Sequence, residues 1–180
     1  MRVISGSARG RKLLAPSGLD TRPTTDRVKE SIFNIISPYL PCDKVLDLFA
    51  GSGALGIEAL SRGSKHGVFV ETDKNAFTVI RQNLDLARVS DKSELVTLDA
   101  FLYLSRTREQ FDIIFLDPPY NTGLLTKAID EIYQKGLLSP NGIIVAESEH
   151  MGEEPDDEYF DIIKRAKYGK TTVFVLRPKA

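Results

Sequence analysis

Short β-rich runs alternate with amphipathic helical segments through the middle of this chain, and this alternation constrains the fold more than any other feature. The apolar runs are four to six residues long, are bounded by Gly, Pro or Asp, and lie at 44–49, 67–71, 94–98, 111–116 and 142–146. Helical patterns lie between them, at 53–62, 74–87 and 124–134. Runs of this length and composition are typical of buried parallel strands. Their alternation with helices predicts an α/β fold with a parallel sheet and helices on both faces.

The two ends of the chain follow a different pattern. Residues 160–167 and 171–177 indicate two strands joined by a glycine turn, which predicts an antiparallel hairpin that closes the sheet. At the front, Arg2–Ser5 and Lys12–Ala15 predict a small β-hairpin. Residues 25–37 then predict a helix between two prolines.

Composition narrows the class of protein. The chain has 180 residues, 42% of them hydrophobic and 27% charged, which is typical of one globular domain. One cysteine excludes a disulfide framework, and two histidines leave little for a metal centre, so we expect no metal. Apolar runs of about four residues predict no membrane span, and the basic N-terminus is followed by no apolar segment that would make it a secretory signal. We expect a cytoplasmic protein.

Charge is unevenly distributed, although the net charge is only −1. Residues 1–30 carry seven Lys and Arg against three acids, and residues 164–180 carry six bases and no acid. These basic ends fit either an anionic partner or an ordinary solvated surface. Residues 147–161 carry eight acids and no Lys or Arg, and we interpret that run as solvated surface.

The first core run ends in a glycine-rich turn. Gly51, Gly53 and Gly56 form G-x-G-x-x-G after the run and at the start of a helical pattern. Glycines there let the backbone turn tightly and approach a ligand, and the helix N-terminus behind them attracts an anion. We therefore expect Gly51, Ser52 and Gly53 to bind a cofactor; the alternative is a turn that serves packing alone.

Acidic residues follow the first two runs. Glu71, beside Thr72, lies 20 residues after Gly51, where a carboxylate can accept hydrogen bonds from both hydroxyls of a ribose. Asp47 ends the first run and would repel a pyrophosphate, whereas it suits a sulfonium or an α-amine. The pattern therefore favours S-adenosylmethionine over a dinucleotide.

A third acid follows the third run. Asp99, beside Ala100, can accept a hydrogen bond from an adenine amino group. The same side chain can cap the helix expected at 100–106, and the two roles are compatible.

The most specific motif is Asp117-Pro118-Pro119-Tyr120, which follows the run at 111–116. The exocyclic amine of a base is a poor nucleophile because its lone pair is delocalised into the ring. Asp117 and the carbonyl of Pro118 can each accept one N–H and hold that lone pair towards a methyl donor. Tyr120 can stack on the base, worth about 1–3 kcal/mol. The alternative is a proline-rich strand exit with a buried tyrosine.

A nucleic-acid substrate needs positive charge outside such a pocket, because a duplex hides the amine and the base must be single-stranded or flipped out. The candidates for phosphate contacts are Arg9, Arg11, Lys12, Arg22 and Arg27. For each of them a solvated surface position is the alternative.

These motifs together resemble a known family. Residues 47–56 (DLFAGSGALG) with 117–120 (DPPY) resemble the class I S-adenosylmethionine-dependent methyltransferases that act on amino groups. Residues 2–13 (RVISGSARGRKL) and 21–35 (TRPTTDRVKESIFNI) are similar to the bacterial 16S rRNA guanine-N2 methyltransferase family (RsmD-like), and that resemblance covers nearly the whole chain.

The resemblance implies a seven-stranded, mostly parallel Rossmann-like sheet with a C-terminal antiparallel hairpin and a small N-terminal β-hairpin. It implies one methyltransferase domain, with residues 1–22 as an RNA-facing extension and 23–180 as the cofactor-binding catalytic core. S-adenosylmethionine would contact Asp47, the 51–53 turn, Glu71 and residues 99–100, and the enzyme would methylate the N2 amine of a guanine. The expected partner is 16S rRNA within a small ribosomal subunit or assembly particle, bound by a monomer; the acidic stretch 153–158 has no role that the family suggests.

Other functions share some of these features. A DNA adenine-N6 or cytosine-N4 methyltransferase uses the same loop but usually needs a separate recognition domain. A protein-glutamine methyltransferase usually has Asn at the position of Asp117 and a larger N-terminal domain. A nicotinamide-dependent oxidoreductase would explain the glycine turn and Glu71 but would leave residues 117–120 unused. A non-catalytic RNA-binding assembly factor would not need the complete set of acidic residues.

Overall fold

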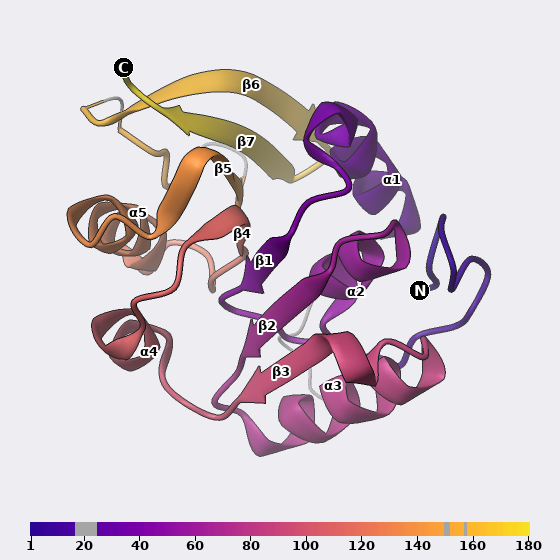
Figure 1. Ribbon diagram of the computed structural model, residues 1–180. Coiled ribbons are helices and arrows are strands. Elements are labelled where there is room, and N and C mark those ends of the chain that lie inside the picture. Colours follow the sequence, from indigo (N-terminus) through magenta and orange to yellow (C-terminus); the bar gives the residue numbers. More distant parts are fainter. Residues whose placement is uncertain (17–24, 150–151, 157) are drawn as a thin grey trace.

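The computed structural model describes residues 1–16, 25–149, 152–156 and 158–180 (Figure 1). The strands are β1 Lys44–Asp47, β2 His66–Val70, β3 Ser93–Val96, β4 Phe111–Leu116, β5 Leu138–Glu149, β6 Phe160–Tyr168 and β7 Thr171–Pro178. The α-helices are α1 Asp26–Ile35, α2 Ala54–Ser61, α3 Lys74–Leu86, α4 Ala100–Arg106 and α5 Leu124–Gln134. Short 3-10 helices occupy Ser37–Tyr39 and Ser90–Lys92.

The described strands form a seven-stranded sheet with the order β3-β2-β1-β4-β5-β7-β6. The first five strands pair in parallel, and β7 runs antiparallel to both β5 and β6. The order reverses between β1 and β4, which is the switch point where sheets of this kind bind ligands. The predicted fold class, including the closing C-terminal hairpin, is confirmed.

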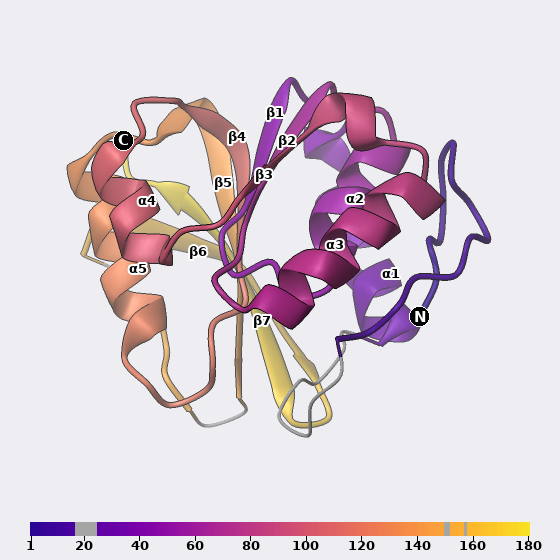
Figure 2. The ribbon, with the colours of Figure 1, turned by 90° about the horizontal axis from the view of Figure 1, so that it is seen from below.

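Helices cover both faces of the sheet (Figure 2). Helices α4 and α5 lie on one side and α1, α2 and α3 on the other. Neighbouring residues of a strand point to opposite faces, so Leu46 of β1 packs into the core beneath α4 and α5. Val45 instead packs in a cluster with Ile32 and Phe33 of α1. The strands are apolar on both faces for this reason.

The N-terminal hairpin is shorter than the sequence predicts. Its described backbone pairs through one antiparallel bridge, between Arg2 and Lys12, and not as two strands over Arg2–Ser5 and Lys12–Ala15. Hydrogen bonds from the Val3 amide to the Arg11 carbonyl, and from the Leu13 amide to the Met1 carbonyl, flank the bridge. The turn is present, but the prediction of two strands is wrong.

Contacts with helix side chains explain the short pairing. The amides of Ile4 and Ser5 donate to the two carboxylate oxygens of Glu58 on α2, at 2.9 and 3.1 Å. The amide of Leu14 donates to the side-chain oxygen of Asn83 on α3, at 2.7 Å. Backbone groups that would extend a ladder bond to α2 and α3 instead, and this docks the hairpin on those helices.

Candidate active site

The carboxyl ends of β1, β2 and β4 surround a cavity of about 660 Å³. The residues that line it, among those described, are Ala15, Pro16, Asp47, Leu48, Phe49, Ala50, Gly51, Ser52, Ala54, Leu55, Val70, Glu71, Thr72, Leu98, Asp99, Asp117, Pro118, Pro119, Tyr120 and Leu124. Parallel strands bring their carboxyl ends to one edge, so residues far apart in the sequence meet here. The volume is within the usual range for a small-molecule site.

Most of the predicted site residues lie on this cavity. Nine of the eleven cofactor and catalytic candidates contribute to its lining. The two exceptions are Gly53, which caps α2 beneath the turn, and Ala100, which is buried in α4. The structure therefore brings the glycine turn, the acidic residues and the residues 117–120 together.

The three glycines of the turn have two different physical roles. Gly51 and Gly53 have φ values of 58° and 80°, in the left-handed region that favours glycine. Gly56 has no such requirement, but a Cβ atom there would lie 2.4 Å from the ring of Phe69 on β2. The first two glycines shape the turn, and the third lets α2 pack closely on the sheet.

Asp47 is buried at the end of β1, and its Oδ2 accepts a hydrogen bond from the amide of Gly56 at 3.1 Å. Gly53, at the N-cap of α2, has no side chain, so this carboxylate satisfies a free amide of the first turn. Burial raises the pKa of Asp47 to about 8; the Gly56 bond opposes the shift, while Asp117 and Glu71 add to it. A carboxyl in this setting is stabilised in its charged form by a cation placed beside it.

Glu71 holds the turn from the end of β2. Its Oε1 accepts from the amide of Gly51 at 2.9 Å, and its Oε2 accepts from the amides of Thr72 and Asp73 at 2.9 and 3.0 Å. A carboxylate has about four acceptor positions, so Oε1 keeps one for a ligand hydroxyl. The side chain is thereby aimed at the cavity that it lines.

Asp99 caps α4, as one of its two predicted roles requires. Its Oδ1 accepts from the amides of Phe101 and Leu102 at 2.9 and 3.2 Å. Both bonds end on the same oxygen, so Oδ2 has no hydrogen bond to a residue that the structure describes. The carboxylate also lines the cavity, so the cap leaves an acceptor for a ligand.

The residues 117–120 leave β4 along one wall of the cavity. The hydroxyl of Tyr120 lies 3.3 Å from Oγ1 of Thr171, the first residue of β7. After the motif, Asn121 adopts φ 56° and donates from Nδ2 to the carboxylate of Glu149 at 2.7 Å. The loop is therefore held by the ends of β5 and β7.

The cavity is acidic. Four of the described lining residues are carboxylates, namely Asp47, Glu71, Asp99 and Asp117, and none of the described lining residues is Lys, Arg or His. A pyrophosphate would meet repulsion here without a compensating cation, whereas a positively charged ligand would be attracted. This charge distribution favours a sulfonium cofactor over a dinucleotide.

Sequence reasoning missed one wall of the site. Ala15 and Pro16, which follow the N-terminal hairpin, line the cavity. The buried Asn83 of α3 holds this segment: it accepts from the Leu14 amide and donates from Nδ2 to the carbonyls of Leu14 and Ser52, both at 2.9 Å. One amide side chain thus joins the glycine turn to the hairpin, and no spacing in the sequence marks it.

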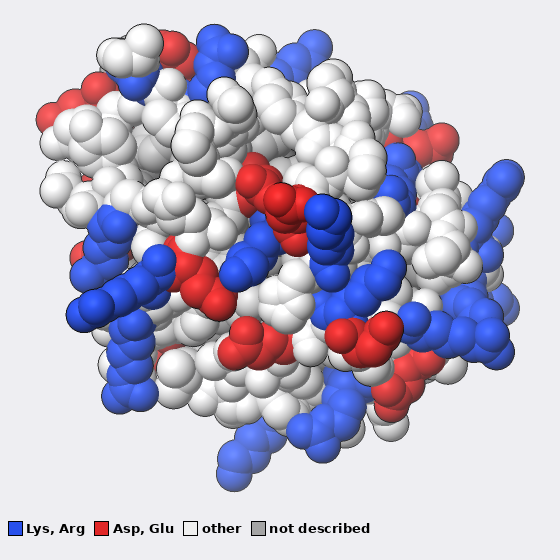
Figure 3. Space-filling view, viewed as in Figure 1, with Lys and Arg blue, Asp and Glu red and all other residues white. Residues whose placement is uncertain are grey.

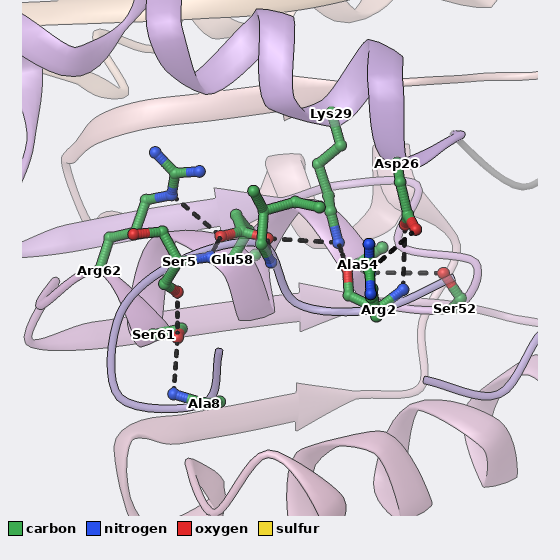
Figure 4. Close-up of polar contacts among 12 residues, drawn as sticks. Arg2, Ser5, Ala8, Asp26, Lys29, Ser52, Ala54, Glu58, Ser61 and Arg62 are labelled. Carbon is green, nitrogen blue, oxygen red and sulfur yellow. Dashed lines mark hydrogen bonds and ion pairs between the residues drawn. The ribbon is translucent and has the colours of Figure 1, made fainter. Parts of the chain in front are cut away.

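A buried ion pair holds the hairpin to the core (Figure 4). Lys29 of α1 and Glu58 of α2 are both fully buried, with Nζ 3.2 Å from Oε1. Lys29 also donates to the carbonyl of Arg2, and Arg62 donates from Nε to Oε2 of Glu58 at 2.9 Å. The sequence suggested neither Lys29 nor Glu58, because both lie within ordinary helical patterns.

None of the four predicted RNA contacts that the structure describes lines the cavity. Arg9 and Lys12 are exposed on the hairpin, and Arg27 is exposed in the first turn of α1. Arg11 donates from Nη1 to the carbonyl of Leu86 at 3.0 Å. Arg22 lies outside the described residues. Figure 3 shows Lys and Arg side chains gathered at the edge of the molecule formed by the N-terminal segment.

The described residues contain neither a metal-binding cluster nor a membrane-spanning helix. Within the described ranges, no group of three or more His, Cys, Asp or Glu could hold a metal ion. Among the described helices, none has the length and apolar character needed to cross a membrane.

Known proteins that are similar to this chain are named as methyltransferases. Residues 1–177 match the family model described as conserved hypothetical protein 95. The chain is 44% identical to Bacillus subtilis YlbH, named provisionally as an rRNA methyltransferase, over 99% of this chain and 100% of that protein. It is 40% identical to the ribosomal RNA small subunit methyltransferase D of Haemophilus influenzae, over 83% of this chain and 79% of that protein. The solved structure of Escherichia coli YhhF, named provisionally as a methyltransferase, superposes with a TM-score of 0.87 and 33% identity, over 100% and 98% of the two chains.

Proposed function

The chain belongs to the family described as conserved hypothetical protein 95, and we propose that it transfers a methyl group from S-adenosylmethionine to the N2 amine of a guanine in 16S rRNA. The observation that carries the proposal is the cavity in which a glycine turn and the residues 117–120 face each other among four carboxylates. Relatives that cover most of this chain are named as methyltransferases of small-subunit rRNA, which supports the same substrate class.

The cavity residues fit S-adenosylmethionine. Asp47 provides a buried carboxyl beside the glycine turn, and the cationic part of the cofactor would stabilise its charged form. Glu71 keeps an acceptor for the ribose hydroxyls, and Oδ2 of Asp99 is an acceptor for the adenine amine. Ser52, Thr72 and their neighbours complete the walls. When bound, the cofactor supplies an electrophilic methyl group on a sulfonium.

The residues 117–120 position the guanine. The Asp117 carboxylate and the Pro118 carbonyl each accept one N–H of the amine, so that its lone pair is less delocalised into the ring and is held towards the methyl donor. Tyr120 stacks on the base, with its hydroxyl held by Thr171. Asp117 takes up the proton that the methylated amine releases. The newly methylated amine is a cation and gives up its proton easily, so a weak base suffices.

The two parts of the chain have separate tasks in this proposal. Residues 23–180 form the catalytic core, and residues 1–22 face the RNA within one methyltransferase domain. Phosphates of 16S rRNA in a small ribosomal subunit or assembly particle are contacted by Arg9, Arg11, Lys12, Arg22 and Arg27. The protein acts as a monomer in the cytoplasm, where these particles assemble.

Methyl transfer from labelled S-adenosylmethionine to small ribosomal particles and to naked rRNA tests the proposal. The acceptors come from cells that lack this protein, and the product is digested to nucleosides for mass spectrometry. We expect N2-methylguanosine from the unaltered protein and from the control Asp161→Ala, which removes an exposed carboxylate on β6, but none from Asp117→Ala. A different methylated nucleoside would overturn the guanine assignment, and label in DNA or protein alone would overturn the RNA substrate.

The hairpin assignment has its own test. Replacing Arg9, Arg11 and Lys12 by Ala should weaken RNA binding and leave the Kd for S-adenosylmethionine within about twofold, because these side chains lie outside the cavity lining. Equal weakening of both ligands would show that the hairpin acts by supporting the fold.

A further inference from the structure

The turn between β6 and β7 lies at the rim of the cavity. Tyr168 pairs with Thr171, which leaves Gly169 and Lys170 as a two-residue turn, with Gly169 at φ 58°. Positive φ at the first central residue is what a type II′ hairpin turn requires, and glycine provides it without strain. The turn therefore holds its neighbours in a defined position.

Strand direction brings this turn to the catalytic loop. Because β7 runs antiparallel to β5, its first residue, Thr171, pairs with Glu149 at the carboxyl end of β5. Oγ1 of Thr171 then lies 3.3 Å from the hydroxyl of Tyr120. Figure 2 shows the β6–β7 turn, the end of β5 and the segment between β4 and α5 reaching the same lower edge.

Lys170 lies within this turn, and Lys167 lies two residues before Gly169 on β6. Lys167 and Lys170 are both exposed, and neither has a carboxylate within ion-pair distance in the part of the chain that the structure describes. Arg165, on the same strand, differs because it pairs with Glu154 at 2.7 Å. No acidic residue occurs from residue 162 to residue 180, so the positive charge of this hairpin is not offset within its own sequence.

We propose that Lys167 and Lys170 bind the RNA phosphates next to the target nucleotide, at the catalytic rim. This inference rests on the proposed function. A flipped base enters the cavity while its backbone stays at the mouth, and the carboxylates that line the cavity repel that backbone. Cations at the rim offset this repulsion. The N-terminal hairpin docks on α2 and α3, whereas the turn lies beyond β4 and β5 in the sheet order, so the two basic groups lie on different sides of the site.

A matched pair of double variants tests the assignment. Lys167→Ala with Lys170→Ala removes both charges at the rim. The control, Lys164→Ala with Lys179→Ala, removes two charges from the same hairpin at positions away from the rim. Lys164 pairs with Val175 in the middle of the hairpin, and Lys179 follows the end of β7 opposite to Thr171. The measurements are the KM for small ribosomal particles over a salt series, the affinity for naked 16S rRNA, and the Kd for S-adenosylmethionine.

The rim variant should raise the KM for particles about 15-fold at 0.15 M salt, since each phosphate of a single strand that is no longer neutralised costs about fourfold in affinity. Its slope of log affinity against log salt should fall by about 1.4. The control should stay within about twofold, and the Kd for S-adenosylmethionine should not change in either variant.

Three outcomes would overturn the assignment. Equal effects of the two double variants would show a diffuse electrostatic contribution and not a rim contact. Loss of affinity for particles with unchanged affinity for naked rRNA would place the turn against a ribosomal protein. Failure of the unaltered protein to methylate RNA would refute the proposed function itself, and this inference with it.

Discussion

Replacing Glu58 by Gln removes one charge from the buried pair that holds the hairpin while keeping the size of the side chain. In the structure Glu58 accepts from Lys29, Arg62 and the amides of Ile4 and Ser5. Without the carboxylate, the ammonium of Lys29 stays buried with only neutral oxygens in contact, the carbonyl of Arg2 and the amide oxygen of the new Gln. Breaking a fully buried pair in this way costs about 3–5 kcal/mol in the free energy of unfolding.

Lys29→Met should cost much less. Burial is the main cause that lowers the pKa of Lys29, so removing the ammonium also removes a desolvation penalty. Glu58 would keep Arg62 and the two hairpin amides as partners, which limits the expected loss to about 1–2 kcal/mol. The two single changes therefore have unequal costs although they break the same pair.

Urea denaturation at pH 7 measures both free energies, and the double variant completes a cycle. We expect Lys29→Met with Glu58→Gln to be more stable than Glu58→Gln alone, because the isolated ammonium is gone. Limited proteolysis of the Glu58→Gln protein should cut first in residues 1–16, because the NH2 group of Gln cannot accept one of the two hydrogen bonds that this segment donates to Glu58. Equal costs of the two single changes, or a loss below about 1 kcal/mol for Glu58→Gln, would refute the reasoning.

Three further predictions concern the cavity. Asp117→Ala should abolish methyl transfer and leave the Kd for S-adenosylmethionine within about threefold; turnover near that of the unaltered protein in the nucleoside assay would remove Asp117 from the reaction. Glu71→Ala should raise that Kd by at least about tenfold in calorimetry, since the turn at Gly51 loses its acceptor and the ribose its partner; an unchanged Kd would show that the ribose assignment is wrong. Because the pKa of Asp47 in the folded protein, about 8, exceeds the ordinary value of 3.8, its contribution to stability is present below pH 4 and is lost as the pH rises to 8. The stability of Asp47→Asn relative to the unaltered protein should therefore increase as the pH rises from 4 to 8 in urea titrations. A stability difference that does not change with pH would contradict the pKa shift.

Local sequence patterns predicted most of the framework. The sequence predicts three features at strand ends, and the structure has them there: the glycine turn, the acidic residues at the ends of β1 and β2, and the residues 117–120. The family resemblance is confirmed by the match over residues 1–177. The alternation of apolar runs with helical patterns was enough to predict the fold class, because hydrophobic period and turn residues are properties of residues that are neighbours in the sequence.

Contacts between distant segments could not be read in this way. Lys29 and Glu58 look like solvent-facing charges of helical segments, yet both are buried where α1, α2 and the N-terminal hairpin meet. Asn83 joins Leu14 to Ser52 across gaps of 69 and 31 residues, and no periodicity reports such a pairing. Hydrogen bonds to these side chains also replaced the longer strand pairing expected in the hairpin.

The sequence by itself determined the α/β class, the parallel core of the sheet and which side chains stand at its strand ends, because these depend on local propensity and on short motifs. Only the tertiary structure decided that Ala15 and Pro16 wall the cavity and that the turn before Thr171 stands beside Tyr120. The physical reason is that burial and charge pairing belong to a residue's neighbours in space, and the chain acquires those neighbours only when it folds.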